Sequence, residues 1–259
     1  MRTMEADLQA AVVPPGGVRL WWLCGAGFAF KTGSGCIVYV DPYLSDAVER
    51  LHGFKRLSLA PIAAEQVRAD WVILSHEHTD HLDPDALPVI ARHNPACRFA
   101  APAGCRAGLA QAGVAPGRQV LLEAGQTYQL EDLTLHTAQA DHGDYSPTAL
   151  GFVFDFGGVR VLYTGDTALR PQAFQPLYAL HPDILLPCIN GTFGNMNHHD
   201  ALLMAQQCRP RVVIPHHYWL FAEQGGDPGA FVHMCRSLCP GVQPLLLKPG
   251  EGFTLERDI

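Results

Sequence analysis

The chain of 259 residues lacks the features that mark membrane, secreted and modular proteins. No apolar run is long enough to span a bilayer, and residues 1–13 do not combine a basic segment with an apolar core, as a signal peptide would. We therefore expect a soluble, cytoplasmic protein with no membrane partner. Linkers, low-complexity segments and internal repeats are also missing. We predict a single domain over residues 1–259.

Positive charge is scarce. The sequence has 18 Lys and Arg against 25 Asp and Glu, which gives a formal net charge of -7. Nucleic-acid binding needs a basic surface that neutralises phosphates, so this balance argues against a nucleic-acid partner. A small-molecule substrate is the expected partner.

Cysteine motifs are absent as well. The 8 cysteines include no CxxC pair, and their spacing suggests no disulfide framework in a chain of this length. They stand in segments that look like strands or helices. We expect most of them to be small buried apolar residues.

Histidine, by contrast, is abundant, and it is concentrated after one apolar run. The segment 71–83 begins as a short buried strand and then places five ionisable residues within the six positions from His76 to His81. Such residues cannot continue a buried strand without a large desolvation cost. His76 and His78 point to the same side if the segment is extended, and Asp80 and His81 follow as the chain turns. Imidazole with carboxylate suits zinc, iron or manganese. A solvated surface loop is the weaker alternative.

Three further loops that follow apolar strands carry residues able to bind a metal. They contain Asp141-His142, Gly165-Asp166 and His216-His217. Taken singly, Asp166 is typical of a turn and His142 of a protein surface. If the strand ends share one edge of the fold, however, all of these loops meet there, where α/β sheets commonly place their sites.

The order of expected elements indicates the fold class. Residues 18–23, 28–31 and 37–40 predict an antiparallel meander, and residues 84–92 predict a helix that starts at Pro84 with Asp83 as its N-cap. Strands then alternate with helices in two halves. This pattern predicts an α/β fold with a four-layer αββα sandwich.

The histidine-rich motif HxHxDH, with a distal His, an Asp after a strand and a last His, resembles the metallo-β-lactamase fold superfamily. Residues 20–23, 164–167, 213–217 and 227–228 together also resemble its L-ascorbate-6-phosphate lactonase-like branch. The resemblance covers nearly the whole chain from about residue 18. It implies the metallo-β-lactamase fold and an assembly of more than one copy of the chain.

The resemblance also implies two adjacent metal positions with a shared ligand. The first would be held by His76, His78 and His142, the second by Asp80, His81 and His217, and Asp166 would bridge them. The last ligand usually stands two residues after a proline, here Pro215, which selects His217 and leaves His216 as the alternative. Asp41 resembles an acid that orients a ligand histidine. One or two divalent ions are expected, zinc or manganese first, with iron acceptable.

These ligands predict a metal-dependent hydrolase. A metal-activated hydroxide would attack a small lactone or ester, and Asp80 would orient it and later help to protonate the leaving group. The alternatives are a phosphodiesterase or phosphoesterase of the same fold, or a metal-binding protein without catalysis.

A Gly/Asn-rich loop over residues 190–197 supplies further candidates. Asn190 and Asn195 are candidate substrate or supporting residues, although an ordinary turn before a capped helix explains them equally well. Asn197 and Asp200 resemble a capping box. Tyr218 is a candidate pocket residue whose alternative is a place in the core.

Overall fold

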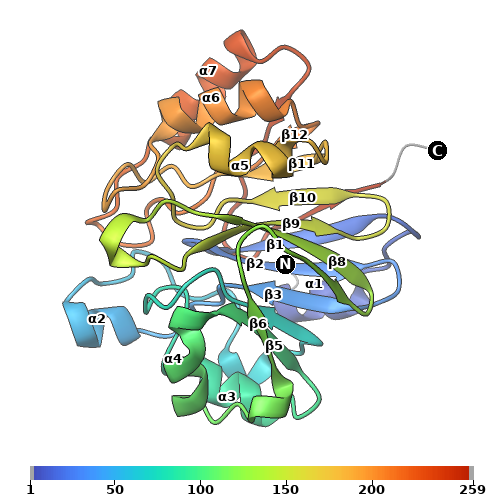
Figure 1. Cartoon of the computed structure of the whole chain (residues 1–259), viewed down its shortest axis with the longest axis vertical. Coiled ribbons are helices and arrows are strands. Elements are labelled where there is room, and N and C mark those ends of the chain that lie inside the picture. The colour runs from blue at the N-terminus through green and yellow to red at the C-terminus, as the bar shows by residue number, and fades with distance from the viewer. Residues whose placement is uncertain (1–2, 257–259) are drawn as a thin grey trace. The chain divides into compact units, whose positions relative to one another are not determined.

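The computed structural model describes residues 3–256 and divides the chain into two compact units. Of the described residues, the first unit comprises 3–122 with 247–256, and the second comprises 123–246. Each unit is built on a 7-stranded sheet (Figure 1). Within the described part of the chain, no helix is both long enough and apolar enough to cross a membrane. The single-domain organisation stays a prediction.

The sheet of the first unit joins an antiparallel meander to a parallel half. Its strands are β1 (Val18–Cys24), β2 (Gly27–Thr32), β3 (Ile37–Val40), β4 (Trp71–Ile73), β5 (Arg98–Pro102), β6 (Gln119–Leu122) and β14 (Gly252–Leu255). Their order is β14-β1-β2-β3-β4-β5-β6. The predicted meander is confirmed, because β1, β2 and β3 pair antiparallel. Strands β3 to β6 pair parallel.

The first unit has one helix before β1 and further helices between its strands. They are α1 (Met4–Ala10), α2 (Ala47–His52), α3 (Ala86–His93) and α4 (Arg106–Gln111), with short 3-10 turns η1 (Ala64–Gln66), η2 (Ala103–Cys105) and η3 (Pro116–Arg118). Side chains of α1, α3 and the strands form one apolar core that includes Leu8, Val72, Ile90 and Phe99. This core fixes the strand ends from which the ionisable loops leave.

The predicted start of α3 was wrong by two residues. The helix begins at Ala86 with Asp85 at the N-cap position, and not at Pro84 after Asp83. The Asp83 carboxylate nevertheless makes the hydrogen bonds of a capping residue, because its Oδ1 accepts the backbone N–H groups of Asp85 and Ala86, both at 3.0 Å. Its Oδ2 accepts the backbone N–H of Leu44 at 2.8 Å.

The second unit repeats the same plan, with an antiparallel half followed by a parallel half. Its strands are β7 (Thr127–Leu130), β8 (Leu133–Gln139), β9 (Leu150–Asp155), β10 (Arg160–Tyr163), β11 (Ile184–Leu186), β12 (Val212–Val213) and β13 (Gln243–Pro244). The sheet order is β13-β12-β11-β10-β9-β8-β7. Its helices are α5 (Pro171–Tyr178), α6 (His198–Cys208) and α7 (Pro228–Leu238), with a 3-10 turn η4 (Gly143–Tyr145), and α6 and α7 lie together (Figure 1). The capping box of Asn197 and Asp200 at the start of α6 is confirmed.

Strand direction decides where the ionisable loops emerge. In the second unit β8 and β10 run the same way, because each pairs antiparallel with β9, and β12 runs parallel to β10 through β11. The loops that follow β8, β10 and β12 therefore leave the same edge of this sheet. In the first unit β3 and β4 are parallel, so the residues after them share an edge in the same way.

Candidate metal centre

In the first unit, the carboxylate of Asp41 orients one histidine of the HxHxDH motif. Asp41 follows β3 and is fully buried, and its Oδ2 lies 2.7 Å from Nδ1 of His81, which is also fully buried. A carboxylate at this distance holds the proton on Nδ1, so the lone pair that can bind a metal is on Nε2. The Asp41 backbone has a φ of 44°, which only a supporting structure maintains in a residue other than glycine.

Ser75 extends this network to the second histidine. Its backbone N–H donates to Asp41 Oδ1 at 2.7 Å, and its hydroxyl donates to Asp41 Oδ2 at 2.5 Å. The same hydroxyl lies 2.9 Å from His76 Nδ1, where it accepts the ring proton. His76, like His81, is therefore left with its lone pair on Nε2. Ser75 is not among the residues predicted from the sequence, although its place directly before His76 was a usable signal.

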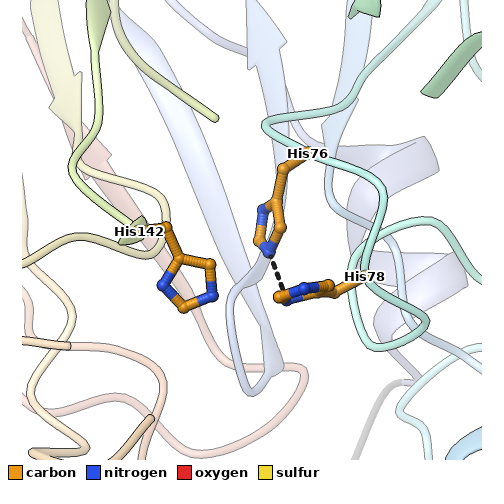
Figure 2. A group of neighbouring side chains, drawn as sticks. All are labelled: His76, His78 and His142. Atoms are coloured by element: carbon orange, nitrogen blue, oxygen red, sulfur yellow. Dashed lines mark hydrogen bonds between the residues drawn. The ribbon is translucent and has the colours of Figure 1, made fainter. Parts of the chain in front are cut away.

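The two histidines that are two residues apart lie side by side, as an extended segment requires. His76 Nε2 and His78 Nδ1 are 3.0 Å apart, and Figure 2 shows the two rings together. Their ring centroids are 4.6 Å apart, with the rings edge to face. Asp80 follows, with Oδ2 at 4.0 Å from His81 Nε2 and a side chain that is 18% exposed. Asp80 is thus the carboxylate of this group that solvent reaches.

We call Asp41, Ser75, His76, His78, Asp80 and His81 the first-unit cluster. Ligand atoms of Asp41, His76 and His81 lie within 4.8 Å of one another, and all three residues are buried. The cluster combines imidazole lone pairs with a carboxylate, that of Asp41, which is buried from water. This donor chemistry fits a divalent cation, because a bound positive charge compensates the buried carboxylate.

In the second unit, two of the predicted ligands flank the predicted bridging carboxylate. Asp166 follows β10 and is 4% exposed. Its Oδ1 lies 3.1 Å from His217 Nε2, and its Oδ2 lies 3.8 Å from Nε2 of His142, which follows β8. The two imidazoles thus face different oxygens of one carboxylate. We call His142, Asp166 and His217 the second-unit cluster, and its donor set also fits a divalent ion.

The structure separates the two adjacent histidines that the sequence left as alternatives. His217 lies at Asp166 and has a φ of 59°. His216 instead stacks on Tyr163, with ring centroids 4.9 Å apart, and its Nε2 donates to the backbone carbonyl of Leu186 at 3.1 Å. His216 is therefore placed as a core residue, whereas His217 has the geometry of a ligand.

Two residues outside the predicted ligand set hold the loops of the second unit together. Asn195 Nδ2 donates to Asp166 Oδ2 at 2.7 Å. Thr167 Oγ1 accepts the backbone N–H of Asp141 at 2.9 Å, which fastens the loop that carries His142 to the loop that carries Asp166. Asn195 was predicted from the sequence as a candidate. Thr167 was not, and its position next to Asp166 was the available signal.

The remaining candidates, Asn190 and Tyr218, contact neighbouring residues of their own loops. Asn190 is buried, and its Nδ2 contacts Oγ1 of Thr192 at 3.3 Å and the carbonyl of the same residue at 3.5 Å. Tyr218 is buried, and its ring meets that of Trp219 edge to face at 5.8 Å. These contacts close the turn at Asn190 and bury Tyr218.

The cysteines are free and buried at all 8 positions, as predicted. The thiol of Cys188 is affected by the charge of Asp166, a residue of the second-unit cluster. Burial, and then the charge of Asp166, raise the pKa of this thiol to about 12. The thiol therefore stays protonated near neutral pH and does not compete as a thiolate ligand.

Comparison with known proteins identifies the class. Residues 19–217 match the family described as the Beta-lactamase superfamily domain, and the chain belongs to that superfamily. The structure of Igni18, a metallo hydrolase from Ignicoccus hospitalis, superimposes with a TM-score of 0.76 at 24% identity, over 93% of this chain and 100% of that one. The predicted metallo-β-lactamase fold is confirmed.

The sequence relatives narrow the class to one family. A UPF0173 metal-dependent hydrolase of Aeropyrum pernix is 30% identical over 253 residues, which are 92% of this chain and 98% of that protein. A UPF0173 metal-dependent hydrolase of Archaeoglobus fulgidus is 27% identical over 257 residues, which are 93% of this chain and 100% of that protein. This chain belongs to the UPF0173 metal-dependent hydrolase family. The finer resemblance to the lactonase-like branch stays a prediction.

Proposed function

We propose that the chain is a hydrolase with a dinuclear metal centre, built from the ligand sets that the family resemblance implies. His76, His78 and His142 would hold one ion, Asp80, His81 and His217 the other, and Asp166 would bridge them. One observation carries the proposal: in each unit, buried imidazoles and carboxylates gather at one edge of a sheet with their metal-binding atoms oriented. Family membership supports the same reading. Zinc or manganese is the expected metal, and iron is acceptable.

In this proposal, side chains of the protein orient the histidine ligands and transfer a proton during the reaction. Divalent ions bound at such a centre supply Lewis acidity and lower the pKa of water to about 7, so that hydroxide is present near neutral pH. Asp41 and Ser75 keep the ring protons on Nδ1 of His81 and His76, which leaves both Nε2 atoms as donors. Asp80 is reached by solvent, so its carboxylate would accept a proton from the attacking water and return it to the leaving group.

We propose a small lactone or ester as the substrate. The loop that carries His142 borders a cavity of about 410 Å³, whose lining includes Gln139, Ser146 and Arg170. The Arg170 guanidinium already pairs with Asp141 at 2.5 Å, so its charge is balanced before a substrate arrives. With a formal net charge of -7 for the chain, this lining suits an uncharged carbonyl compound better than a phosphate ester.

The test compares two bond types on one enzyme. The metal-free protein is reloaded with Zn²⁺ or Mn²⁺ and assayed with simple lactones and p-nitrophenyl esters, and separately with bis(p-nitrophenyl) phosphate. We expect metal-dependent turnover of a lactone or ester. Preferential cleavage of the phosphodiester would support the phosphodiesterase alternative. Tight metal binding with no hydrolysis of either class would point to a non-catalytic protein.

A further inference from the structure

The chemistry of the two side chains fixes which of them donates in the hydrogen bond between Asn195 and Asp166. Asn195 Nδ2 lies 2.7 Å from Asp166 Oδ2. An ionised carboxylate only accepts hydrogen bonds, so the end of the amide that faces it must be the NH₂ group. Asn195 is 8% exposed and Asp166 4%. The bond is thus a charge-assisted one shielded from water, which is among the stronger kinds in proteins.

The loop that carries Asn195 is shaped to deliver this side chain. It folds back on itself through a backbone hydrogen bond from Gly191 to Met196 at 2.9 Å. Phe193 adopts a φ of 55°, a conformation that residues other than glycine seldom hold without support. The backbone N–H of Met196 then donates to the carbonyl of Thr167 at 2.8 Å. The loop is therefore joined to the Asp166 segment by two hydrogen bonds, one from the backbone of Met196 and one from the side-chain amide of Asn195.

The Asn195 bond distinguishes the two oxygens of the carboxylate. Oδ1 faces His217 Nε2 at 3.1 Å, and Oδ2, which accepts from Asn195, faces His142 Nε2 at 3.8 Å. Each carboxylate oxygen accepts at two positions, so Oδ2 retains a lone pair when Asn195 donates to it. The amide thus restrains rotation of the carboxylate without using up its capacity to bind an ion.

We propose that Asn195 is a positioning residue that holds Asp166 with one oxygen toward each metal position. The inference rests on the proposed function, since it gives Asp166 the bridging role. It goes further by assigning the orientation of that bridge to one side chain on a separate loop. Loss of the Asn195 amide should therefore weaken metal binding, because the carboxylate must then be ordered by the ions themselves.

The experiment compares variants of Asn195 with a control variant of Asn197 in the same loop. Asn195→Leu keeps a similar side-chain volume and removes the donor, and Asn195→Ala is the second variant in case the first does not fold. Asn197→Ala is the matched control, because Asn197 caps α6 through His199 N (2.8 Å) and Asp200 N (3.1 Å). Metal-free proteins are titrated with ZnCl₂ against a chromophoric chelator, and melting temperatures are measured with and without Zn²⁺.

The two roles predict different patterns. If Asn195 positions Asp166, removal of its donor lowers Zn²⁺ affinity by roughly tenfold to a hundredfold and shrinks the Zn²⁺-dependent rise in melting temperature. Asn197→Ala should lower both melting temperatures and leave Zn²⁺ affinity unchanged. The inference is overturned if the Asn195 variants retain wild-type Zn²⁺ affinity. Failure of the wild-type protein itself to bind Zn²⁺ or Mn²⁺ would instead overturn the proposed function, and this inference with it.

Discussion

His216 and His217 are neighbours in the sequence with opposite roles in the structure. His217 lies against Asp166, and His216 lies in the core between Tyr163 and the carbonyl of Leu186. We expect His217→Ala to lose bound metal while its metal-free stability changes little. His216→Ala should lower the free energy of unfolding by about 3 kcal/mol, because it leaves a cavity and an unpaired carbonyl. Elemental analysis and urea unfolding measure the two effects. Metal loss in His216→Ala alone would reverse the assignment.

Asp80 differs from the buried carboxylates because solvent reaches it. Asp80→Asn keeps the shape of the side chain but removes the charge that accepts and returns a proton. We expect kcat to fall by roughly 10²–10⁴-fold, with circular dichroism unchanged. The natural assay is the lactone or ester that the wild-type protein hydrolyses. A fully metallated Asp80→Asn protein with wild-type turnover would refute the catalytic role.

At the scale of elements, close packing of β2 against the end of β3 sets the position of Asp41. A Cβ atom added at Gly27 would lie 2.9 Å from the backbone oxygen of Asp41. Gly27→Ala should therefore destabilise the protein by about 1–3 kcal/mol and weaken metal binding, because Asp41 must move away from His81. Gly117→Ala is the control, since no atom lies within 4 Å of the added Cβ there. Equal unfolding midpoints and metal affinities for the two variants would contradict this account.

The connections between elements explain where the sequence analysis succeeded. The antiparallel meander and the α6 capping box depend on local turn and capping chemistry, and both are confirmed. Strand β14 was missed because it is short and pairs with β1, from which most of the chain separates it. The start of helix α3 was predicted two residues too early, because the residues that Asp83 caps form a turn before the regular helix.

At the scale of the whole molecule, buried thiols should lower the free energy of unfolding as the pH rises into the alkaline range. Burial raises the pKa of Cys97 and Cys208 from 9.0 to about 12 in the folded protein. With a raised folded pKa, the contribution to stability is complete below pH 9 and is lost as the pH rises from 9 toward 12, because the unfolded chain releases these protons first.

Urea unfolding at pH 8 and pH 10 tests this dependence. Each of these thiols should cost about 1.4 kcal/mol of unfolding free energy for each pH unit above 9. Cys208→Ala supplies the comparison, since its loss of stability over the same interval should be smaller than that of the wild-type protein. Identical pH slopes for the two proteins would show that Cys208 ionises as readily in the folded state as in the unfolded chain.

The sequence by itself determined the kinds of ligand and the loops that carry them. A dense group of imidazoles and carboxylates directly after an apolar strand predicts a metal site from the sequence alone. Burying such groups is costly unless something compensates their charge. The ionisable residues after later strands, such as His142 and Asp166, were a weaker signal, because only their shared position after strands distinguished them from turn and surface residues.

Only the tertiary structure decided which atoms of these residues meet. Strand direction brings the ends of β8, β10 and β12 to one edge, and hydrogen bonds between segments distant in the chain place Ser75 at Asp41 and Asn195 at Asp166. The left-handed backbone at His217 turns it toward Asp166, while His216 packs in the core. Local spacing cannot specify these choices, because each is set by contacts that form only when the sheets are assembled.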